Sequence, residues 1–297
     1  MITHHTFRNY SLQALMALLL LFSVHALKAQ KSAEDFYQNG QKKMRSIDFS
    51  GAVGDFSKAI ELKPNYAEAY FKRGTAKDGL EDYRGAIQDY NKALELRPKW
   101  SEVYFNRGTA KYFLKDFDGG CEDFSEAGKL GDTTAYSFMR QYCKSDYLKK
   151  EADEFYKDGL NKYNTGNYEA AIVEFGHAIS VNANYTDAYF SRAKCKSKLK
   201  DFRGAIRDYS KAIDLRPDYT KAYFNRAFAR SEMEDYENAI YDYTKAIKLD
   251  PNYTSAYFNR GNAKFKLGEK DSACEDFSKA GELGDADAYK IIKQYCK

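Results

Sequence analysis

The amino-acid sequence predicts an all-α fold in which helix–turn–helix repeats stack into a solenoid. Three observations support this prediction. A short segment recurs with a spacing of 34 residues, apolar positions between the copies follow a helical period, and proline or small residues return at fixed places. A fixed period of roughly 20–50 residues is typical of stacked supersecondary units, so the period decides the fold class.

The recurring segment reads Tyr-Phe-Xaa-Arg followed by Gly or Ala. It begins at Tyr70, Tyr104, Tyr189, Tyr223 and Tyr257. Alignment on these copies gives seven units, which are residues 33–66, 67–100, 101–134, 152–185, 186–219, 220–253 and 254–287. The position of a residue within its unit is called its slot below.

Each unit is expected to form two helices. Small and apolar residues in its second half fall three or four residues apart, as at Ala86, Tyr90 and Ala93, which is the period of an amphipathic α-helix. Slot 8 holds Gly or Ala in every unit, which lets two helix backbones approach closely. Four units carry a proline at slot 32, where it ends the second helix. These prolines are Pro64, Pro98, Pro217 and Pro251.

The pattern resembles the tetratricopeptide repeat, which has an aromatic at slots 4 and 24, Gly or Ala at slot 8, Ala at slots 20 and 27, and Pro at slot 32. The resemblance recurs in all seven units, with local departures at Lys43, Lys162, Gly120 and Ala183. It implies a right-handed α-solenoid whose concave groove is lined by the first helix of each pair. Since no unit buries its apolar face alone, stability is expected from the stacking of neighbours.

Residues 1–29 are predicted to be a cleaved signal peptide. Arg8 precedes an apolar stretch, and Ala26 and Ala29 follow it, which is the layout of a secretory signal. The apolar stretch is shorter than the roughly 20 residues that span a bilayer, and an uncleaved membrane anchor is the alternative. The mature chain is expected to start near Gln30 in a periplasmic or extracellular compartment.

The repeats are predicted to form two capped arrays. Residues 130–144 are matched by residues 283–297, so a closing helix is expected twice, as terminal repeats need a cap over their apolar face. Array 1 is residues 33–150, with three repeats and a cap, and array 2 is residues 151–297, with four repeats and a cap. No Gly-, Pro- or Ser-rich linker separates them, so helical continuity is expected near 145–152.

Four of the five cysteines form two pairs of equal spacing. Cys121 and Cys143 lie 22 residues apart, as do Cys274 and Cys296. In an exported protein both pairs are predicted disulfides that fasten a cap to its last repeat, worth roughly 3 kcal/mol each; free buried thiols are the alternative. Cys195 takes a slot that holds alanine elsewhere, so a buried small residue is expected there rather than a nucleophile.

Opposite charges recur at slots 7 and 23. The slot-7 arginines are Arg73, Arg107, Arg192, Arg226 and Arg260. The slot-23 acids are Asp55, Asp89, Asp123, Glu174, Asp208, Asp242 and Asp276. We expect each arginine to pair with the acid of the preceding unit, because this leaves no arginine unpaired. Pairing within one unit and a ligand-binding role are the alternatives.

Composition favours binding over catalysis. The 47 basic and 43 acidic side chains nearly balance, which argues against a nucleic-acid-binding surface. Three of the four histidines lie in the first 25 residues, which nearly excludes histidine triads and multi-histidine metal sites. No cofactor or metal is expected. We predict a non-enzymatic scaffold for a peptide or partner protein; the alternative is a structural component or assembly factor of a cell-envelope complex, in contact with envelope proteins.

The predicted binding residues are aromatic. Helix geometry places slots 2, 5, 9, 12 and 13 of the first helices on one stripe, called the groove stripe below. Slot 5 is aromatic in every unit, which suits an extended peptide or partner helix, although packing between helices is the alternative. The predicted binding residues are Tyr37, Phe71, Phe105, Tyr112, Phe113, Tyr156, Phe190, Phe224, Phe228, Phe258 and Phe265. The carboxylate clamp of some relatives is matched only at Asn106 and Asn225, so no clamp is expected.

Overall fold

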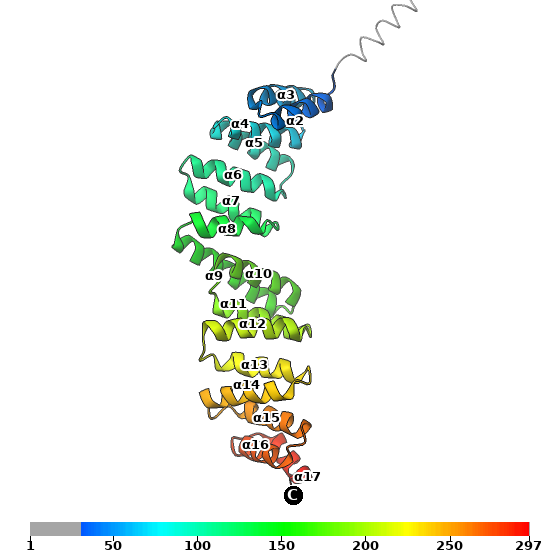
Figure 1. Ribbon diagram of the computed structural model, residues 1–297, viewed down its shortest axis with the longest axis vertical. Coiled ribbons are helices and arrows are strands. Elements are labelled where there is room, and N and C mark those ends of the chain that lie inside the picture. Colours follow the sequence, from blue (N-terminus) through cyan, green and yellow to red (C-terminus); the bar gives the residue numbers. More distant parts are fainter. Residues whose placement is uncertain (1–30, 297) are drawn as a thin grey trace, which may run out of the picture. The chain divides into compact units, whose positions relative to one another are not determined.

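The computed structural model describes residues 31–296, which form helices and no strand (Figure 1). The predicted signal peptide, residues 1–29, lies outside the described residues. The chain divides into two compact units, one ending at Ala135 and the other beginning at Tyr136, and each is described by itself. Within residues 31–296 no helix is both long and apolar enough to cross a membrane.

Helix pairs occupy all seven predicted units. The first helices are α2 (Ala33–Arg45), α4 (Ala67–Gly79), α6 (Ser101–Phe113), α9 (Ser145–Asn164), α11 (Thr186–Lys198), α13 (Thr220–Ser231) and α15 (Thr254–Lys266). The second helices are α3 (Phe49–Leu62), α5 (Tyr83–Leu96), α7 (Phe117–Lys129), α10 (Tyr168–Val181), α12 (Phe202–Leu215), α14 (Tyr236–Leu249) and α16 (Lys270–Glu282). Two further helices, α8 (Thr133–Tyr142) and α17 (Ala286–Tyr295), take the cap positions. The prediction of an all-α repeat solenoid is confirmed.

Packing is local along each compact unit. From α2 to α7, and from α9 to α17, each helix packs on the next one, and successive first helices also contact each other. In the second repeat the slot-24 ring, Tyr90, is buried together with Ala86 and Ala93, because small residues at slots 20 and 27 let the helices close around one large side chain. α9 runs without a break across residues 145–152, as expected; the division of the chain into arrays at 150 and 151 stays a prediction.

The turn between the two helices of a repeat needs a left-handed residue at slot 15. Five repeats place a non-glycine residue there, with φ between 61° and 65°, and two use Gly166 and Gly268. In five repeats the side chain of the next residue caps the second helix, as where the Asp48 carboxylate accepts the Gly51 N–H at 2.9 Å. This acceptor satisfies one of the free N–H groups of the first turn and fixes the start of the helix.

Replacing Ile47 by glycine is expected to stabilise the first repeat by about 1 kcal/mol, because a β-branched side chain is strained in the left-handed region. Ile47 has a φ of 62° and is 73% exposed, so little packing is lost. Urea unfolding of both proteins measures the change. Ser46→Gly, at a φ of −93°, is the control and should gain nothing; a less stable Ile47→Gly protein would contradict the expectation.

The cysteines follow the sequence prediction. Cys274 and Cys296 form a disulfide that joins α16 to the residue after α17, with their Cα atoms 5.7 Å apart. Cys121 and Cys143 are also in the disulfide-bonded state. Cys195 is free and buried, and burial raises the pKa of its thiol to about 11. The reactive thiolate form is therefore scarce at neutral pH, as expected for a packing residue.

Candidate functional site

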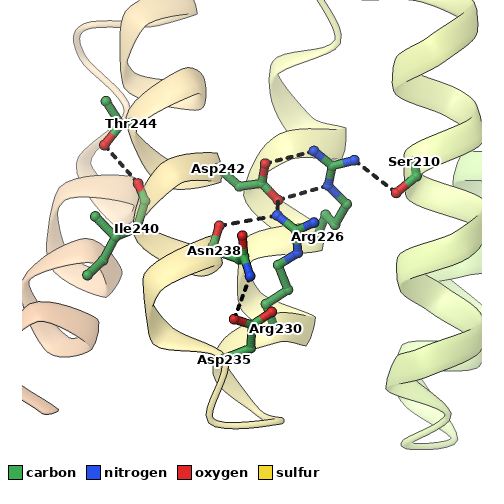
Figure 2. A network of polar contacts seen from close by, with 8 residues as sticks. All are labelled: Ser210, Arg226, Arg230, Asp235, Asn238, Ile240, Asp242 and Thr244. Carbon is green, nitrogen blue, oxygen red and sulfur yellow. Dashed lines mark hydrogen bonds and ion pairs between the residues drawn. The ribbon is translucent and has the colours of Figure 1, made fainter. Parts of the chain in front are cut away.

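In five repeats the slot-23 acid lies between two cations of its own repeat. In the sixth repeat Arg226 donates from Nε and Nη2 to the two Asp242 oxygens at 2.8 and 2.7 Å, and Arg230 donates to the same carboxylate at 2.7 Å. Figure 2 shows both guanidinium groups converging on Asp242 from α13. Asp242 is fully buried, so this triad is a closed internal ion network.

The predicted pairing with the preceding repeat is wrong. Each arginine binds the acid 16 residues later, in its own repeat; the pairs are Arg73–Asp89, Arg107–Asp123, Arg192–Asp208, Arg226–Asp242 and Arg260–Asp276. A cation at slot 11, one helical turn after slot 7, binds the same carboxylate. In the two repeats that have no slot-7 arginine, the slot-11 lysine alone pairs with the acid, as Lys43–Asp55 and Lys162–Glu174. Slots 7 and 11 face the second helix of the same repeat, so both cations reach the slot-23 acid of that repeat rather than the acid of the preceding one.

The arginines nevertheless connect neighbouring repeats. Their remaining Nη1 group donates to the slot-25 side chain of the preceding repeat, as from Arg226 to Ser210 Oγ at 2.8 Å (Figure 2). Arg73, Arg107 and Arg260 make the same contact, whereas Arg192 faces Gly176, which has no side chain. These hydrogen bonds set the stacking of repeats, so the binding surface has to be sought on other slots.

The slot-5 rings pack inside the repeats. Each lies against the slot-24 ring of its own second helix, with centroids 5.5–6.0 Å apart. In five repeats it also contacts the slot-34 ring, at 4.8–5.0 Å. Tyr37 and Phe71 are buried, so for these two the expected exposure to a partner is wrong. The remaining slot-5 rings are half-buried: Phe105, Tyr156, Phe190, Phe224 and Phe258.

Other predicted aromatics are more accessible. Phe113 is 57% exposed and stacks flat on Tyr83, with centroids 4.9 Å apart. Tyr112 contacts both Phe113 and Phe117 edge to face. These four residues, Tyr83, Tyr112, Phe113 and Phe117, are called the aromatic cluster. Sequence reasoning found Tyr112 and Phe113 but missed the two rings on second helices, although an aromatic at slot 17 in nearly every unit is the signal for them.

In the second compact unit the predicted groove aromatics differ in exposure. Phe228, at slot 9, is exposed. Phe265 is half-buried and lies against Tyr295 of the cap helix, with centroids 5.4 Å apart. Phe228 is therefore available to a partner, whereas Phe265 also holds the cap.

A pocket of about 410 Å³ opens between α2 and α4 and is lined by Gln41, Met44, Arg45, Lys72 and Thr75. Arg45 and Lys72 bring two positive charges to it. Lys72 lies over the Phe71 ring at 4.6 Å, and within residues 31–296 neither cation has a carboxylate partner. The slot-11 cations, by contrast, are all paired with the slot-23 acids.

The groove stripe of the second compact unit is also basic. It carries four lysines without a carboxylate partner in the described part of the chain, which are Lys194, Lys198, Lys221 and Lys266. Slot 2 also carries acids, and tyrosine hydroxyls donate to three of them: Tyr66 to Glu34 at 2.5 Å, Tyr185 to Asp153 at 2.7 Å and Tyr219 to Asp187 at 3.2 Å. In the second compact unit, Asp153 and Glu232 are the acids on the stripe that have no ion pair within the described residues, so four unpaired lysines outnumber two unpaired acids there.

Asp78, at slot 12 of the second repeat, is an acid of the stripe that is half-buried. Asp78 accepts a hydrogen bond from the Tyr90 hydroxyl at 3.2 Å, while its Oδ1 is buried without a described partner. Burial raises the pKa of Asp78 to about 6. In the equivalent places Ser197 faces Tyr209 and Ser231 faces Tyr243, so a neutral side chain can fill this position. The charge on Asp78 is thus unfavourable in the folded state at neutral pH.

Asp78→Asn is expected to stabilise the protein by about 1 kcal/mol at pH 7 after discounting for solvent screening. Because the pKa is raised, the folded wild type binds the Asp78 proton more tightly than the unfolded chain does. Protonation therefore stabilises the folded wild type at low pH, and this stabilisation is lost as the pH rises from 4 through 6. The two proteins should therefore be equally stable near pH 4 in urea unfolding across this range. The exposed Asp158→Asn is the control. A variant that is less stable at pH 7 would contradict the assignment.

No cluster of three or more His, Cys, Asp or Glu side chains in residues 31–296 is placed to hold a metal ion. His177 is the histidine within this range, and its Nδ1 is hydrogen-bonded to the Tyr136 hydroxyl at 2.6 Å.

Family models of the tetratricopeptide repeat match residues 67–99, 186–219 and 254–283, and a TPR repeat model matches residues 231–268. A comparison with curated proteins finds no match. The chain is similar to the solved structure of YrrB, described as a TPR protein with an unusual peptide-binding site. Identity is 21%, over 68% of this chain and 95% of that chain, with a TM-score of 0.35.

Two further solved structures are similar to this chain. One is the first TPR of Spaghetti (RPAP3) bound to an HSP90 peptide, with 27% identity over 40% of this chain and 95% of that chain and a TM-score of 0.40. The other is the TPR2AB domain of yeast Sti1 in complex with pHSP90, with 20% identity over 84% of this chain and 98% of that chain and a TM-score of 0.36.

Proposed function

Because this chain belongs to the tetratricopeptide repeat family, we propose that it is a non-enzymatic scaffold that binds a peptide or partner protein along its first helices. The observation that carries the proposal is the set of cations on the first helices that have no carboxylate partner within residues 31–296, together with accessible aromatic rings. Arginine and lysine bind carboxylates through charge-assisted hydrogen bonds, and aromatic side chains supply contact area. The partner is therefore an acidic segment that also carries apolar side chains.

The two compact units offer separate contacts for such a partner. In the first, Arg45 and Lys72 are the carboxylate donors and the aromatic cluster is the apolar surface. In the second, Lys194 and Lys221 are the cations and Phe228 the exposed ring. Opposite charges on the protein and its partner speed their association, and a basic surface favours acidic over basic partners.

The proposed location is periplasmic or extracellular. Disulfides persist in oxidising compartments, and Cys121, Cys143, Cys274 and Cys296 are all oxidised. An envelope partner fits this location. Catalysis has little support, since the free thiol is buried and the described histidine is hydrogen-bonded within the fold.

Peptide binding tests the proposal. A panel of fluorescent peptides that are acidic and aromatic, acidic alone, or basic and aromatic is titrated with the purified protein. We expect the first class to bind best and to weaken as salt rises, because exposed charges are screened. The double change Arg45→Glu and Lys72→Glu should abolish binding to the first compact unit. The double change Lys194→Glu and Lys221→Glu should abolish binding to the second.

The control is Lys92→Glu, on the exposed side of α5, which should leave binding intact. Equal binding of all three peptide classes, or acidic-peptide binding that survives all four groove reversals together, would overturn the proposal. Retained binding after that change would instead favour contacts through the second helices or the ends of the solenoid.

A further inference from the structure

The C-terminal cap helix exposes a side chain whose counterpart in the first cap is buried. Residues 283–297 repeat residues 130–144, so Tyr289 on α17 corresponds to Tyr136 on α8. Tyr136 is 2% exposed, whereas Tyr289 is 59% exposed. Two related cap sequences therefore differ at this tyrosine, which is covered in α8 and exposed in α17.

Within residues 136–297, Tyr136 packs on the first repeat of array 2. Its ring lies edge to face with Phe155, with centroids 6.4 Å apart, and its hydroxyl is hydrogen-bonded to His177 Nδ1 at 2.6 Å. Arg140, one turn further along α8, donates to the backbone carbonyl of Ser180. The cap helix α8 thus contacts the residues at slots 4, 26 and 29 of the repeat that follows it.

The first repeat of the chain presents the same slots at the N-terminal end. They hold Phe36, Lys58 and Glu61. Phe36 is half-buried, and Lys58 Nζ lies 5.4 Å from the centre of its ring. Glu61 is exposed and has no ion pair within residues 31–296, and the same holds for Lys293, the counterpart of Arg140.

We propose that α17 of one chain docks on α2 and α3 of a second copy, in the way that α8 docks on α9 and α10. Tyr289 then covers Phe36, with its hydroxyl accepting a hydrogen bond from the Lys58 ammonium group. Lys293 meets Glu61, which adds an ion pair that Arg140 and Ser180 do not have. The two surfaces differ, so the contact is heterologous, and copies add in rows rather than stopping at a symmetric dimer.

Sedimentation velocity of the purified protein, over about a hundredfold range of concentration, tests the proposal, because association follows mass action. We expect the average mass of the wild type to rise past that of a dimer. Tyr289→Asp should remain monomeric. The control is Tyr241→Asp, since Tyr241 is 57% exposed on α14, away from both ends, and should associate like the wild type.

Charge reversal identifies the two surfaces. Lys293 and Glu61 are both exposed. Lys293→Glu or Glu61→Lys alone places like charges in the contact and should weaken association at least about tenfold. An equimolar mixture should form rows in which the two variants alternate, because each end of one variant meets an end of opposite charge on the other. The double variant should also form rows. Association that no reversal changes, a symmetric dimer at every concentration, or a monomeric wild type would each overturn the proposal.

Discussion

Replacing Asp242 by asparagine is expected to lower the free energy of unfolding by about 3–5 kcal/mol, because it leaves buried cations without a counter-ion. Asp242 is fully buried and accepts three charge-assisted hydrogen bonds from Arg226 and Arg230. Asparagine keeps the shape and one acceptor oxygen but removes the negative charge. The two guanidinium groups would then repel each other at close range.

Urea unfolding, together with hydrogen exchange of α14, measures this loss. Asp55→Asn in the first repeat is the matched control, since its partner Lys43 is 40% exposed and can turn to water. We expect that change to cost no more than about 1 kcal/mol. Changing Arg226 and Arg230 to methionine in the Asp242→Asn protein should recover part of the loss. A cost below about 1 kcal/mol for Asp242→Asn would show that water reaches the triad.

Removing the Cys274–Cys296 disulfide is expected to cost about 3 kcal/mol, because the bond closes a loop of 22 residues that is otherwise free in the unfolded chain. The loss should concentrate in α17, which packs mainly on α16, with a ring contact from Phe265 of α15 to Tyr295, and lies at the end of the stack. Terminal elements of a solenoid open first, since they have a neighbour on only one side.

Cys274→Ser, followed by hydrogen exchange over residues 286–295, measures the effect. Cys195→Ala is the control, because alanine fills the same slot in most other repeats, and it should leave α17 protected. Reducing agent should make wild-type α17 exchange like that of the Cys274→Ser protein. Unchanged protection of α17 after reduction would mean that packing alone holds the cap.

The helices and their ends followed from local sequence. The 34-residue period, the helical spacing of apolar residues and the small residues at slot 8 predicted every helix pair, because each is a property of one helix and its immediate neighbour. The first helix of array 2 also extends back to Ser145, as the absence of a linker led us to expect.

The candidate site was predicted only in part. Phe113 and Phe228 are exposed as expected, while Tyr37 and Phe71 are buried under rings at slots 24 and 34. The slot-34 aromatics were visible in the sequence but stand at the start of the next helix. Their contact with slot 5 depends on the angle at which that helix follows.

The sequence alone determined the repeat, the number of helix pairs, the cap positions and the cysteines that are oxidised, since all of these are encoded by spacing along one chain. Only the tertiary structure decided which acid each arginine binds and which cations stay unpaired. Slots 7, 11 and 23 meet through the packing of two helices, and counting charges along the chain cannot choose between carboxylates that lie at similar sequence distances. The unpaired Arg45 and Lys72, on which the proposed function depends, were visible only after that choice.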